Sequence, residues 1–476
     1  MINPWNTIIN QERRISNVSA GAIAIFAILL LVYAASIDIR ATRGASITGD
    51  EPFYLLTTQS LIEDRNLDLR RQYELHSYES FFDHPDGLWM QSSARKDGKL
   101  LSPHNPGLSV LVIPGFGIGG LIGAQIQMMI IAALTFSLAY ILIVRISGEF
   151  WISWLTTVAV AVTAPAFIYS TEIYPEVPAA LFLIISLLII QRINRSNTWQ
   201  AIGLLLCLTS MVWLGVKYAP LAGLVAIWGF WRMDSPRRSI FLVCTILSAT
   251  LFTWFHLETF GGLTPYSVNL VYAGDGTINI LGDHLDFTQR IYRPLGLFID
   301  ERFGIGRWAP ILLFVLPTAP LLWKITSSSR LILALILTQI LIATFIAITM
   351  MGWWFPGRTI ITVLPLMTLP LVILLMQSPL WVRLTLGVLG IYSLVITALL
   401  AVSGHTREIV IAVDPFDMSS PIFQLIAPMV PDYRMWNAHT WIFTVIWLSI
   451  MGILTLAFYF STAFNQFDRS ADISEN

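Results

Sequence analysis

The sequence predicts an all-α fold, a polytopic helical bundle that spans a membrane, and three observations support this prediction. Of the 476 residues, 55% are hydrophobic and only 12% are charged. The mean hydropathy is +0.70. About twelve apolar runs have the length and composition of spanning helices. A soluble domain carries about twice this charged fraction, so an ordinary soluble protein is excluded.

The expected spans cover most of the chain. They lie near residues 20–37, 123–144, 152–170, 177–191, 199–215, 218–231, 239–257, 308–323, 331–350, 359–376, 381–402 and 440–460. The stretch 107–121 is also apolar, but prolines and glycines interrupt it, and we expect a re-entrant or membrane-skimming helix there. The first run also resembles a signal peptide, yet its uncharged length is enough to span, which favours a retained anchor.

The polar sequence is concentrated in three long loops, 38–106, 258–307 and 403–438, which we expect to carry short amphipathic helices on the outer face. They belong to a single domain over residues 1–462, followed by a short tail at 463–476. The short loops of the other side are basic, as the positive-inside rule requires, so both termini are expected in the cytoplasm. Their basic residues are Arg13, Arg14, Arg145, Arg192, Arg195, Arg232, Arg237, Arg238, Lys324, Arg330, Arg383 and Arg469.

Several classes of protein lack support in the sequence. The two cysteines, Cys207 and Cys244, lie inside apolar runs, which excludes a disulfide framework and a zinc site. No CxxC, Walker loop, GxGxxG after a strand or HExxH motif supports an ATP-driven pump, a dehydrogenase or a zincin. With a net charge of -1 and no basic tract interleaved with aromatic residues, nucleic acid is not an expected partner.

The most informative motif is the acidic pair Asp50-Glu51, directly after the first apolar run and ahead of an expected helix through Glu63. Two adjacent carboxylates at the mouth of a membrane cavity are costly and are not needed for anchoring, which makes them catalytic candidates. Asp and Pro also suit a helix N-terminus, so the alternative is that Asp50 only caps the helix before Pro52. A cap would also fix the direction of the carboxylate.

A second acidic segment, residues 171–178, lies on the same predicted outer side. It carries Glu172 and Glu176, which share one face if the segment is helical. Because the segment contains two prolines, the sequence does not decide whether it is helical. The alternative is a solvated loop in which Glu176 lies near a helix N-terminus.

Basic side chains on the outer side form the third element. A single Lys or Arg at a helix end usually extends to lipid headgroups, whereas several around outward acids favour an anionic partner such as a phosphate. Further outer arginines are Arg290, Arg293 and Arg302. We assign Asp50 and Glu51 as catalytic candidates, and as substrate-binding candidates Tyr54, His104, Glu172, Glu176, Lys217, Tyr218, Arg307 and Arg358.

These parts fit one reaction. A sugar on a polyprenyl phosphate has an activated anomeric carbon, a phosphate leaving group and a tail that needs an apolar groove. Arg or Lys would neutralise the departing phosphate, and a carboxylate would accept the proton of the acceptor hydroxyl. No nucleotide is required, in keeping with an outer-face site and the absence of a nucleotide motif.

An ordered set of motifs resembles bacterial GT-C glycosyltransferases, relatives of the protein O-mannosyltransferases and of the aminoarabinose transferase that acts on lipid A. The resemblance runs from the first span to about residue 376. Its motifs are the acidic pair, the stretch from Leu56 to Arg70, His104 to Leu108, Glu172 to Glu176, Gly296 to Asp300, and Trp353 to Arg358.

The resemblance implies a GT-C-like multi-helix fold in a bacterial cell (inner) membrane, a polyprenyl-phosphate sugar as co-substrate, inversion at the sugar, and Asp50 as the leading carboxylate. It also implies a donor-phosphate role for Arg358. The order Pro356-Gly357 before this arginine is reversed from the usual one, which puts the local backbone in question. The sequence firmly implies no cofactor and assigns no metal ligand. Some relatives need a divalent metal and others do not, and the sequence does not decide between these alternatives.

The sequence leaves rival functions and several identities open. A transporter or flippase for lipid-linked glycans would explain the helices and outward cations, but would show related halves and charges near the bilayer midplane. A polymerase or ligase of similar architecture would use a lipid-diphosphate glycan. The sugar, the acceptor (lipid, glycan or protein) and the oligomeric state are not specified by the sequence.

Overall fold

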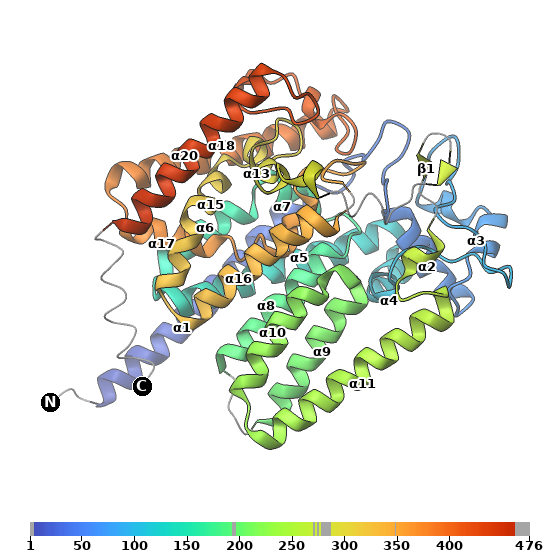
Figure 1. The fold of residues 1–476 in the computed structure, drawn as a ribbon, viewed down its shortest axis with the longest axis horizontal. Helices are drawn as coiled ribbons and strands as arrows, with labels where there is room; N and C mark the ends of the chain where they lie inside the picture. The colour runs from blue at the N-terminus through green and yellow to red at the C-terminus, as the bar shows by residue number, and fades with distance from the viewer. Residues whose placement is uncertain are drawn as a thin grey trace.

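The computed structural model describes residues 4–192, 197–269, 272–273, 276–277, 287–347 and 349–461. Within these residues the regular secondary structure is helical, apart from a small antiparallel ribbon of β1 (Tyr272–Ala273) and β2 (Gly276–Thr277) (Figure 1). The prediction of an all-α fold is therefore confirmed. The predicted tail at 463–476 and parts of the predicted loop 258–307 lie outside the described residues.

Nine longer helices form the body of the described chain. They are α1 (Pro4–Ala34), α5 (Ile113–Ser147), α8 (Glu176–Arg192), α9 (Thr198–Leu214), α10 (Ala219–Arg232), α11 (Ser235–Phe260), α16 (Ser327–Leu341), α18 (Leu380–His405) and α20 (Ala438–Phe460). Several begin on residues that helix N-termini prefer, since the side chains of Asn197, Asp234, Thr326 and Asn437 each accept a hydrogen bond from the first turn of α9, α11, α16 and α20.

Shorter elements connect and cover this body. The α-helices are α2 (Glu51–Glu63), α3 (Arg70–Glu74), α4 (Gly107–Leu111), α6 (Phe150–Ala161), α7 (Ala164–Tyr169), α13 (Arg293–Ile299), α14 (Ile305–Trp308), α15 (Val315–Thr318), α17 (Thr368–Gln377) and α19 (Pro421–Gln424). The single turns are η1 (Ser77–Ser80), η2 (Val216–Tyr218), η3 (Pro265–Val268), η4 (Thr288–Arg290), η5 (Pro310–Phe314), η6 (Ala319–Lys324), η7 (Ile342–Ile346), η8 (Arg358–Val363), η9 (Pro415–Asp417) and η10 (Ala427–Met429).

Six helical segments of the described chain are long and apolar enough to cross a membrane, and the chain is a multi-pass membrane protein. They are Ser16–Ala34, Ile113–Ser147, Ser235–Val268, Ser327–Ile346, Leu380–His405 and Ala438–Phe460. The count of about twelve spans stays a prediction, because several other expected spans are helices of 10–17 residues.

Three expected spans are broken, and proline explains each break. The span at 152–170 divides into α6 and α7, with Pro165 in the first turn of α7. The span at 308–323 is a series of short turns that begin at or near Pro310, Pro317 and Pro320. The span at 359–376 starts as the turn η8 and passes through a further turn around Pro365 before α17 begins. Proline lacks the N–H that a helix interior needs, so apolar length alone overstated these helices.

The predicted re-entrant stretch at 107–121 is divided between α4 and the start of α5. Inside α5 the backbone leaves helical geometry at Gly119 and Gly120, where Gly120 has a φ of +57°. The chain folds back so closely that a Cβ on Gly123 would lie 2.1 Å from the carbonyl oxygen of Gly115. Gln127 fastens the kink, since its amide oxygen accepts from the Gly115 N–H at 2.8 Å. Glycine is therefore required here for close backbone approach.

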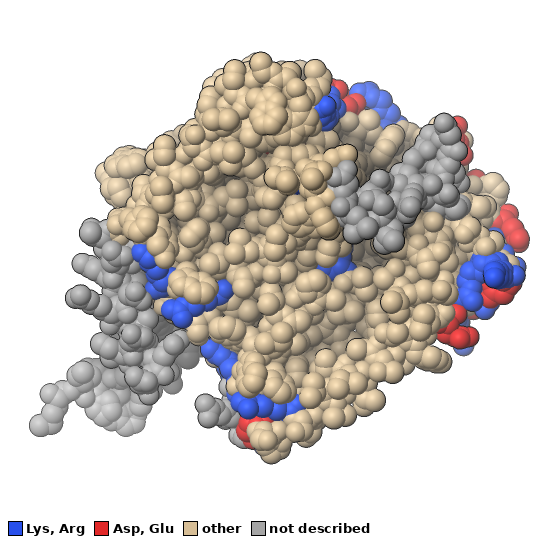
Figure 2. All heavy atoms as spheres, in the orientation of Figure 1, with Lys and Arg blue, Asp and Glu red and all other residues tan. Residues whose placement is uncertain are grey.

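Central and peripheral helices differ in burial. In the most apolar 18-residue stretch of α5, and likewise of α16, 61% of the residues are buried inside the protein. The corresponding fractions are 17% for α11 and 11% for α20. The helices α2, α3 and α4 lie with β1 at one end of the molecule (Figure 1). Figure 2 shows most charged side chains gathered toward the ends of the visible face, with a broad surface between them on which only one small basic patch is visible. Such a band suits the hydrocarbon core of a bilayer.

Candidate active site

A cavity of about 1690 Å³ opens beside α2 and is lined by segments that are far apart in the sequence. Its walls come from the loops around residues 42–50, 82–91 and 103–105, from the starts of α8 and η2, and from the end of α16 with the segment up to residue 359. The structure brings seven of the ten predicted site residues to this cavity: Asp50, Tyr54, His104, Glu176, Lys217, Tyr218 and Arg358.

The backbone before α2 directs Asp50 into the cavity. Gly49 has a φ of +61°, and a Cβ there would lie 2.7 Å from the Tyr174 hydroxyl, so only glycine fits without displacement. Asp50 occupies the N-cap position, but within the described chain its carboxylate accepts no hydrogen bond from the first turn of α2. The capping interpretation is therefore wrong, and the carboxylate is available to the cavity.

A similar glycine precedes the arginine. Gly357 has a φ of +94°, and a Cβ there would lie 2.9 Å from Cγ2 of Ile305. This left-handed turn starts η8 and places Arg358 at its first position. The Tyr169 hydroxyl donates to the Phe355 carbonyl just before the turn. The unusual order Pro356-Gly357 thus forms a defined turn that presents the arginine.

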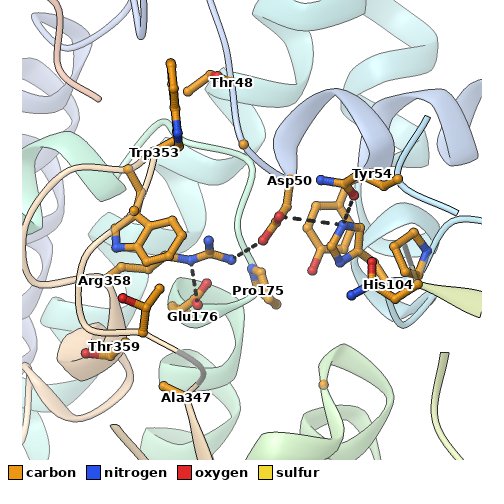
Figure 3. Close-up of a pocket in the computed structure, with 18 of the residues that line it drawn as sticks. Thr48, Asp50, Tyr54, His104, Pro175, Glu176, Ala347, Trp353, Arg358 and Thr359 are labelled. Carbon is orange, nitrogen blue, oxygen red and sulfur yellow. Dashed lines mark hydrogen bonds and ion pairs between the residues drawn. The ribbon is translucent and has the colours of Figure 1, made fainter. Parts of the chain in front are cut away.

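Four charged side chains form a continuous chain along the cavity, shown in part in Figure 3. Arg358 Nη2 donates to Asp50 Oδ2 at 2.6 Å. The Nε of the same guanidinium donates to Glu176 Oε1 at 3.1 Å, and Lys217 Nζ donates to that oxygen at 2.7 Å. Alternating charges of this kind stabilise one another where water is scarce. We call Asp50, Arg358, Glu176 and Lys217 the charge chain.

Two aromatic rings hold the guanidinium of Arg358 in place. Its Cζ lies 3.9 Å from the centre of the Tyr174 ring and 5.1 Å from that of Trp354. The Tyr174 hydroxyl also donates to the Thr48 carbonyl at 3.3 Å. Tyr174 therefore contacts both the arginine and the loop that carries Asp50. Sequence reasoning did not assign it to the site, although it lies between the two predicted glutamates.

His104 approaches the other oxygen of Asp50. Its Nε2 lies 3.7 Å from Asp50 Oδ1 and 2.8 Å from the amide oxygen of Gln91 (Figure 3). The imidazole ring packs 4.8 Å from the Tyr54 ring, centre to centre. Asn105, the next residue, is bound at 3.1 Å to His256 of α11, which fixes this loop against the bundle.

The site sets the charge of Asp50 and His104. Burial raises the pKa of the Asp50 carboxyl, but Arg358, His104 and Lys217 outweigh it and hold the pKa well below its usual range. Burial lowers the pKa of His104, and the Asp50 charge only partly offsets this. Asp50 is thus ionised and His104 neutral at pH 7.

Glu51 lies behind the cavity instead of lining it. Its two carboxylate oxygens accept from the backbone N–H groups of Thr48 at 3.1 Å and Ile173 at 2.9 Å. The side chain is 2% exposed and ties the loop before α2 to the loop before α8. This geometry fits a role for Glu51 in orienting the loop of Asp50, and not contact with an acceptor.

Glu172 is also buried outside the cavity. The segment Thr171–Pro175 is not helical and Glu176 begins α8, so the two glutamates do not share a helical face. Within the described chain, Glu172 Oε2 has no hydrogen-bond partner. Burial raises the pKa of Glu172, and the charge of Glu51 raises it further; burial likewise raises the pKa of Glu51.

Arg307 lies away from the cavity, contrary to its predicted place beside a phosphate. It donates to the Glu301 carbonyl and to the Gln424 amide oxygen, each at 2.9 Å, and its Cζ lies 4.2 Å from the Phe423 ring centre. Arg290 and Arg293 donate to backbone carbonyls at the end of η7. The arginines of the predicted outer segments thus have two uses. Of Arg290, Arg293, Arg307 and Arg358, the last is the one that belongs to the charge chain.

Among the described residues, no group of three or more His, Cys, Asp or Glu side chains is placed to hold a metal ion. Asp50 and Glu176 both face the cavity, but each is engaged by a cation of the charge chain. What the arrangement offers is a partly exposed carboxylate, two adjacent cations and a neutral imidazole around one cavity.

No family model matches the chain, and no curated protein matches it. Two solved structures do, both of ArnT from Cupriavidus metallidurans, one in the apo state and one bound to undecaprenyl phosphate. Each is 12% identical and covers 91% of this chain, with TM-scores of 0.49 and 0.47 over 76% and 77% of the ArnT chain. Likeness at this level assigns neither a family nor an activity.

Proposed function

We propose that this protein is a membrane glycosyltransferase that transfers a sugar from a polyprenyl phosphate to an acceptor at the outer face of a bacterial cell membrane. The observation that carries the proposal is the charge chain in one cavity. Asp50 supplies a carboxylate for the acceptor, and Arg358 with Lys217 supplies charge for a phosphate. The basic short loops favour an outer position for this cavity and a cytoplasmic position for both termini.

The cavity also has the apolar wall that a prenyl tail needs. Ile342, Ala343 and Ile346 of η7 line it, together with Ala347 just after η7 and Leu214 at the end of α9. Ile346 is 46% exposed. A tail along this wall would extend from the cations toward the hydrocarbon core, so a lipid phosphate fits better than a soluble nucleotide sugar. Burial of each tail methylene contributes roughly 0.8 kcal/mol.

In the proposed reaction the acceptor oxygen attacks the anomeric carbon while Asp50 takes the hydroxyl proton. The bond between the anomeric carbon and the phosphate oxygen breaks, and its electron pair leaves with the polyprenyl phosphate. Arg358 and Lys217 offset the charge that develops on this leaving group. Attack opposite the phosphate inverts the anomeric centre. The proton on Asp50 then passes to water.

The other predicted residues have supporting roles in this proposal. Tyr54, Tyr218 and His104 line the cavity beside the charge chain and would contact the sugar. Glu51 orients the Asp50 loop, and Glu172 is buried outside the cavity. Arg307 has no part in the proposed site.

The test is transfer by the purified protein in lipid nanodiscs, given a panel of undecaprenyl-phosphate sugars with candidate acceptors. Mass spectrometry would detect release of undecaprenyl phosphate and one added sugar on the product. Asp50→Asn should lower the rate about 10²–10⁴-fold, the usual contribution of a general base. Asp234→Asn, the same change at an acid that is paired with Arg237 at the start of α11 and does not line the cavity, should leave the rate unchanged.

Three outcomes would contradict the proposal. Intact lipid-linked glycan that only changes leaflet would indicate a flippase. A product longer by many units from a lipid-diphosphate donor would indicate a polymerase. Unchanged transfer by Asp50→Asn would remove this residue from the mechanism.

A further inference from the structure

We propose that the donor phosphate takes the place of Asp50 on Arg358, so that the base is released only when the donor is bound. The inference rests on the proposed function, because it concerns the same cavity. It adds an exchange of ion-pair partners inside the charge chain. This exchange implies an order of events in which the donor binds before Asp50 can act on the acceptor.

The two cations are already arranged around one point. Arg358 Nε and Lys217 Nζ both contact the single oxygen Glu176 Oε1, at 3.1 and 2.7 Å. The two nitrogens therefore cannot lie farther apart than the sum of these two distances. At such a separation, each nitrogen can contact a different oxygen of the same phosphate. Lys217 is 37% exposed, so its remaining N–H groups reach the cavity. A phosphate entering here meets both cations together.

The two acids of the chain differ in how firmly they are held. The Glu176 side chain is 3% exposed and contacts both cations, whereas the Asp50 side chain is 25% exposed and contacts Arg358 through one oxygen. A buried carboxylate loses more by giving up its cations than one that water can reach. An incoming phosphate therefore displaces Asp50 and leaves Glu176 in place.

Arg358 keeps its position during the exchange. Its guanidinium stays on the Tyr174 ring and on Glu176, neither of which the phosphate replaces. Asp50 retains His104 at 3.7 Å from its second oxygen. The exchange thus needs a change in one carboxylate rotamer and no movement of a helix.

The exchange changes Asp50 from an ion-pair partner into a base. While Arg358 holds the carboxylate, its pKa lies well below the usual range, and such a group is a weak proton acceptor. A phosphate on Arg358 cancels the guanidinium charge and adds negative charge nearby, and both effects raise the pKa of Asp50. The acceptor is then deprotonated only where a donor is ready to be attacked.

The test measures binding of sugar-free polyprenyl phosphate to the full-length protein in nanodiscs, by native mass spectrometry. Asp50→Asn removes the competitor of the phosphate and should tighten binding about tenfold, a factor equal to one charge-assisted hydrogen bond of roughly 1.4 kcal/mol. Asp234→Asn, at an acid paired with Arg237 away from the cavity, should bind like the wild type. Lys217→Gln should weaken binding but keep the tenfold gain from Asp50→Asn, because the Arg358 pair remains.

Double variants separate exchange from simple charge repulsion. In an Arg358→Gln background, Asp50→Asn should give a gain under twofold, because no shared arginine is left. Arg358→Lys, which keeps the charge but loses the planar fork, serves as the second background and should give an intermediate gain. A gain that is equally large without Arg358, or no gain in Asp50→Asn alone, would overturn the exchange.

Sugar transfer measured on the same samples separates the two proposals. Wild-type transfer with no gain in Asp50→Asn would leave the function standing and overturn the exchange. No transfer from any donor, together with the Arg358-dependent gain, would overturn the function and support the exchange. Wild-type protein that binds no polyprenyl phosphate would overturn both.

Discussion

Two buried charged clusters on the predicted outer side use the same residue types in different ways. In the charge chain, Asp50 and Arg358 bind each other across 308 positions of sequence and line a cavity. In the second cluster, Asp300 accepts from the backbone N–H groups of Arg302, Phe303 and Tyr433, and Arg307 donates to a carbonyl and an amide. Neither residue of this second cluster lines the cavity.

The contrast extends to the protonation of the two aspartates. Burial raises the pKa of Asp300 to about 6, and its three backbone hydrogen bonds only partly oppose this. The pKa of Asp50 is shifted the other way because Arg358, His104 and Lys217 outweigh burial. A charged group with neutral backbone partners fastens the fold, whereas one paired with an opposite charge at a cavity can exchange that partner for a ligand. The partner, more than burial, distinguishes a site.

Exchanging the two arginines for glutamine is the strongest way to break this comparison. Arg358→Gln should lower transfer about 10²–10³-fold, since it removes one charged contact to the leaving phosphate. Arg307→Gln should leave the rate per folded molecule within about twofold while lowering thermal stability. Transfer rates normalised to folded protein check both. Equal losses of rate in the two variants would contradict the distinction.

A glycine substitution tests whether the left-handed turn at Gly357 sets the site geometry. Gly357→Ala should lower transfer about tenfold or more, because a φ of +94° is strained for alanine and its Cβ would meet Ile305. Gly261→Ala is the matched control, since Gly261 also has a positive φ, but its Cβ would meet nothing within 4 Å. Both should cost stability, and only the first should cost rate. Matching rate losses would show that strain alone, without misplacement of Arg358, accounts for the effect.

Asp300→Asn tests the structural role of the second cluster. The amide replaces one of the two carboxylate oxygens with a donor, so at least one of the three backbone N–H groups loses its acceptor. The free energy of unfolding should fall by about 1–3 kcal/mol. Thermal unfolding in detergent measures this change. An unchanged midpoint would argue against a fastening role for Asp300.

The buried pair Glu51 and Glu172 gives the smallest effect, a dependence of stability on pH. Because both pKa values are raised, the folded protein keeps protons that the unfolded chain has released above the ordinary glutamate pKa of about 4.3. The contribution of this pair to stability is therefore greatest below that pH. It falls as pH rises through the folded pKa values, by roughly 1.4 kcal/mol for each pH unit in which the folded protein holds one proton more than the unfolded chain.

The check is a comparison of unfolding midpoints between pH 5 and 8. Wild type should lose stability over this range, and the double variant Glu51→Gln with Glu172→Gln should lose less. Parallel curves would show that this pair does not titrate above the normal range.

The sequence predicted the charge chain because each member lies next to an apolar run on one predicted side. The positive-inside rule was enough to predict that Asp50, Glu176, Lys217 and Arg358 lie on the same side of the membrane. It could not separate Arg307 from Arg358, since both are arginines in outer segments and only tertiary contacts distinguish them. Tyr174 was missed because an aromatic residue near a helix start has many ordinary uses.

The fold was predicted in class and less well in detail. The length of the apolar runs correctly predicted the helical body. It wrongly predicted a single span over α6 and α7, and another single span over η5, α15 and η6. The prolines that break these segments are present in the sequence, but the prediction gave more weight to hydropathy than to proline. The kink at Gly119 and Gly120 depends on close contact between Gly115 and Gly123, which a local pattern does not encode.

The most direct measurement is the single-turnover release of polyprenyl phosphate by Asp50→Asn and Asp300→Asn, side by side in one lipid preparation. The two changes are chemically identical and both acids are on the predicted outer side. We predict a loss of at least about 100-fold for Asp50→Asn and less than about twofold per folded molecule for Asp300→Asn. Equal rates in the two variants would contradict the assignment of the charge chain as the site of transfer.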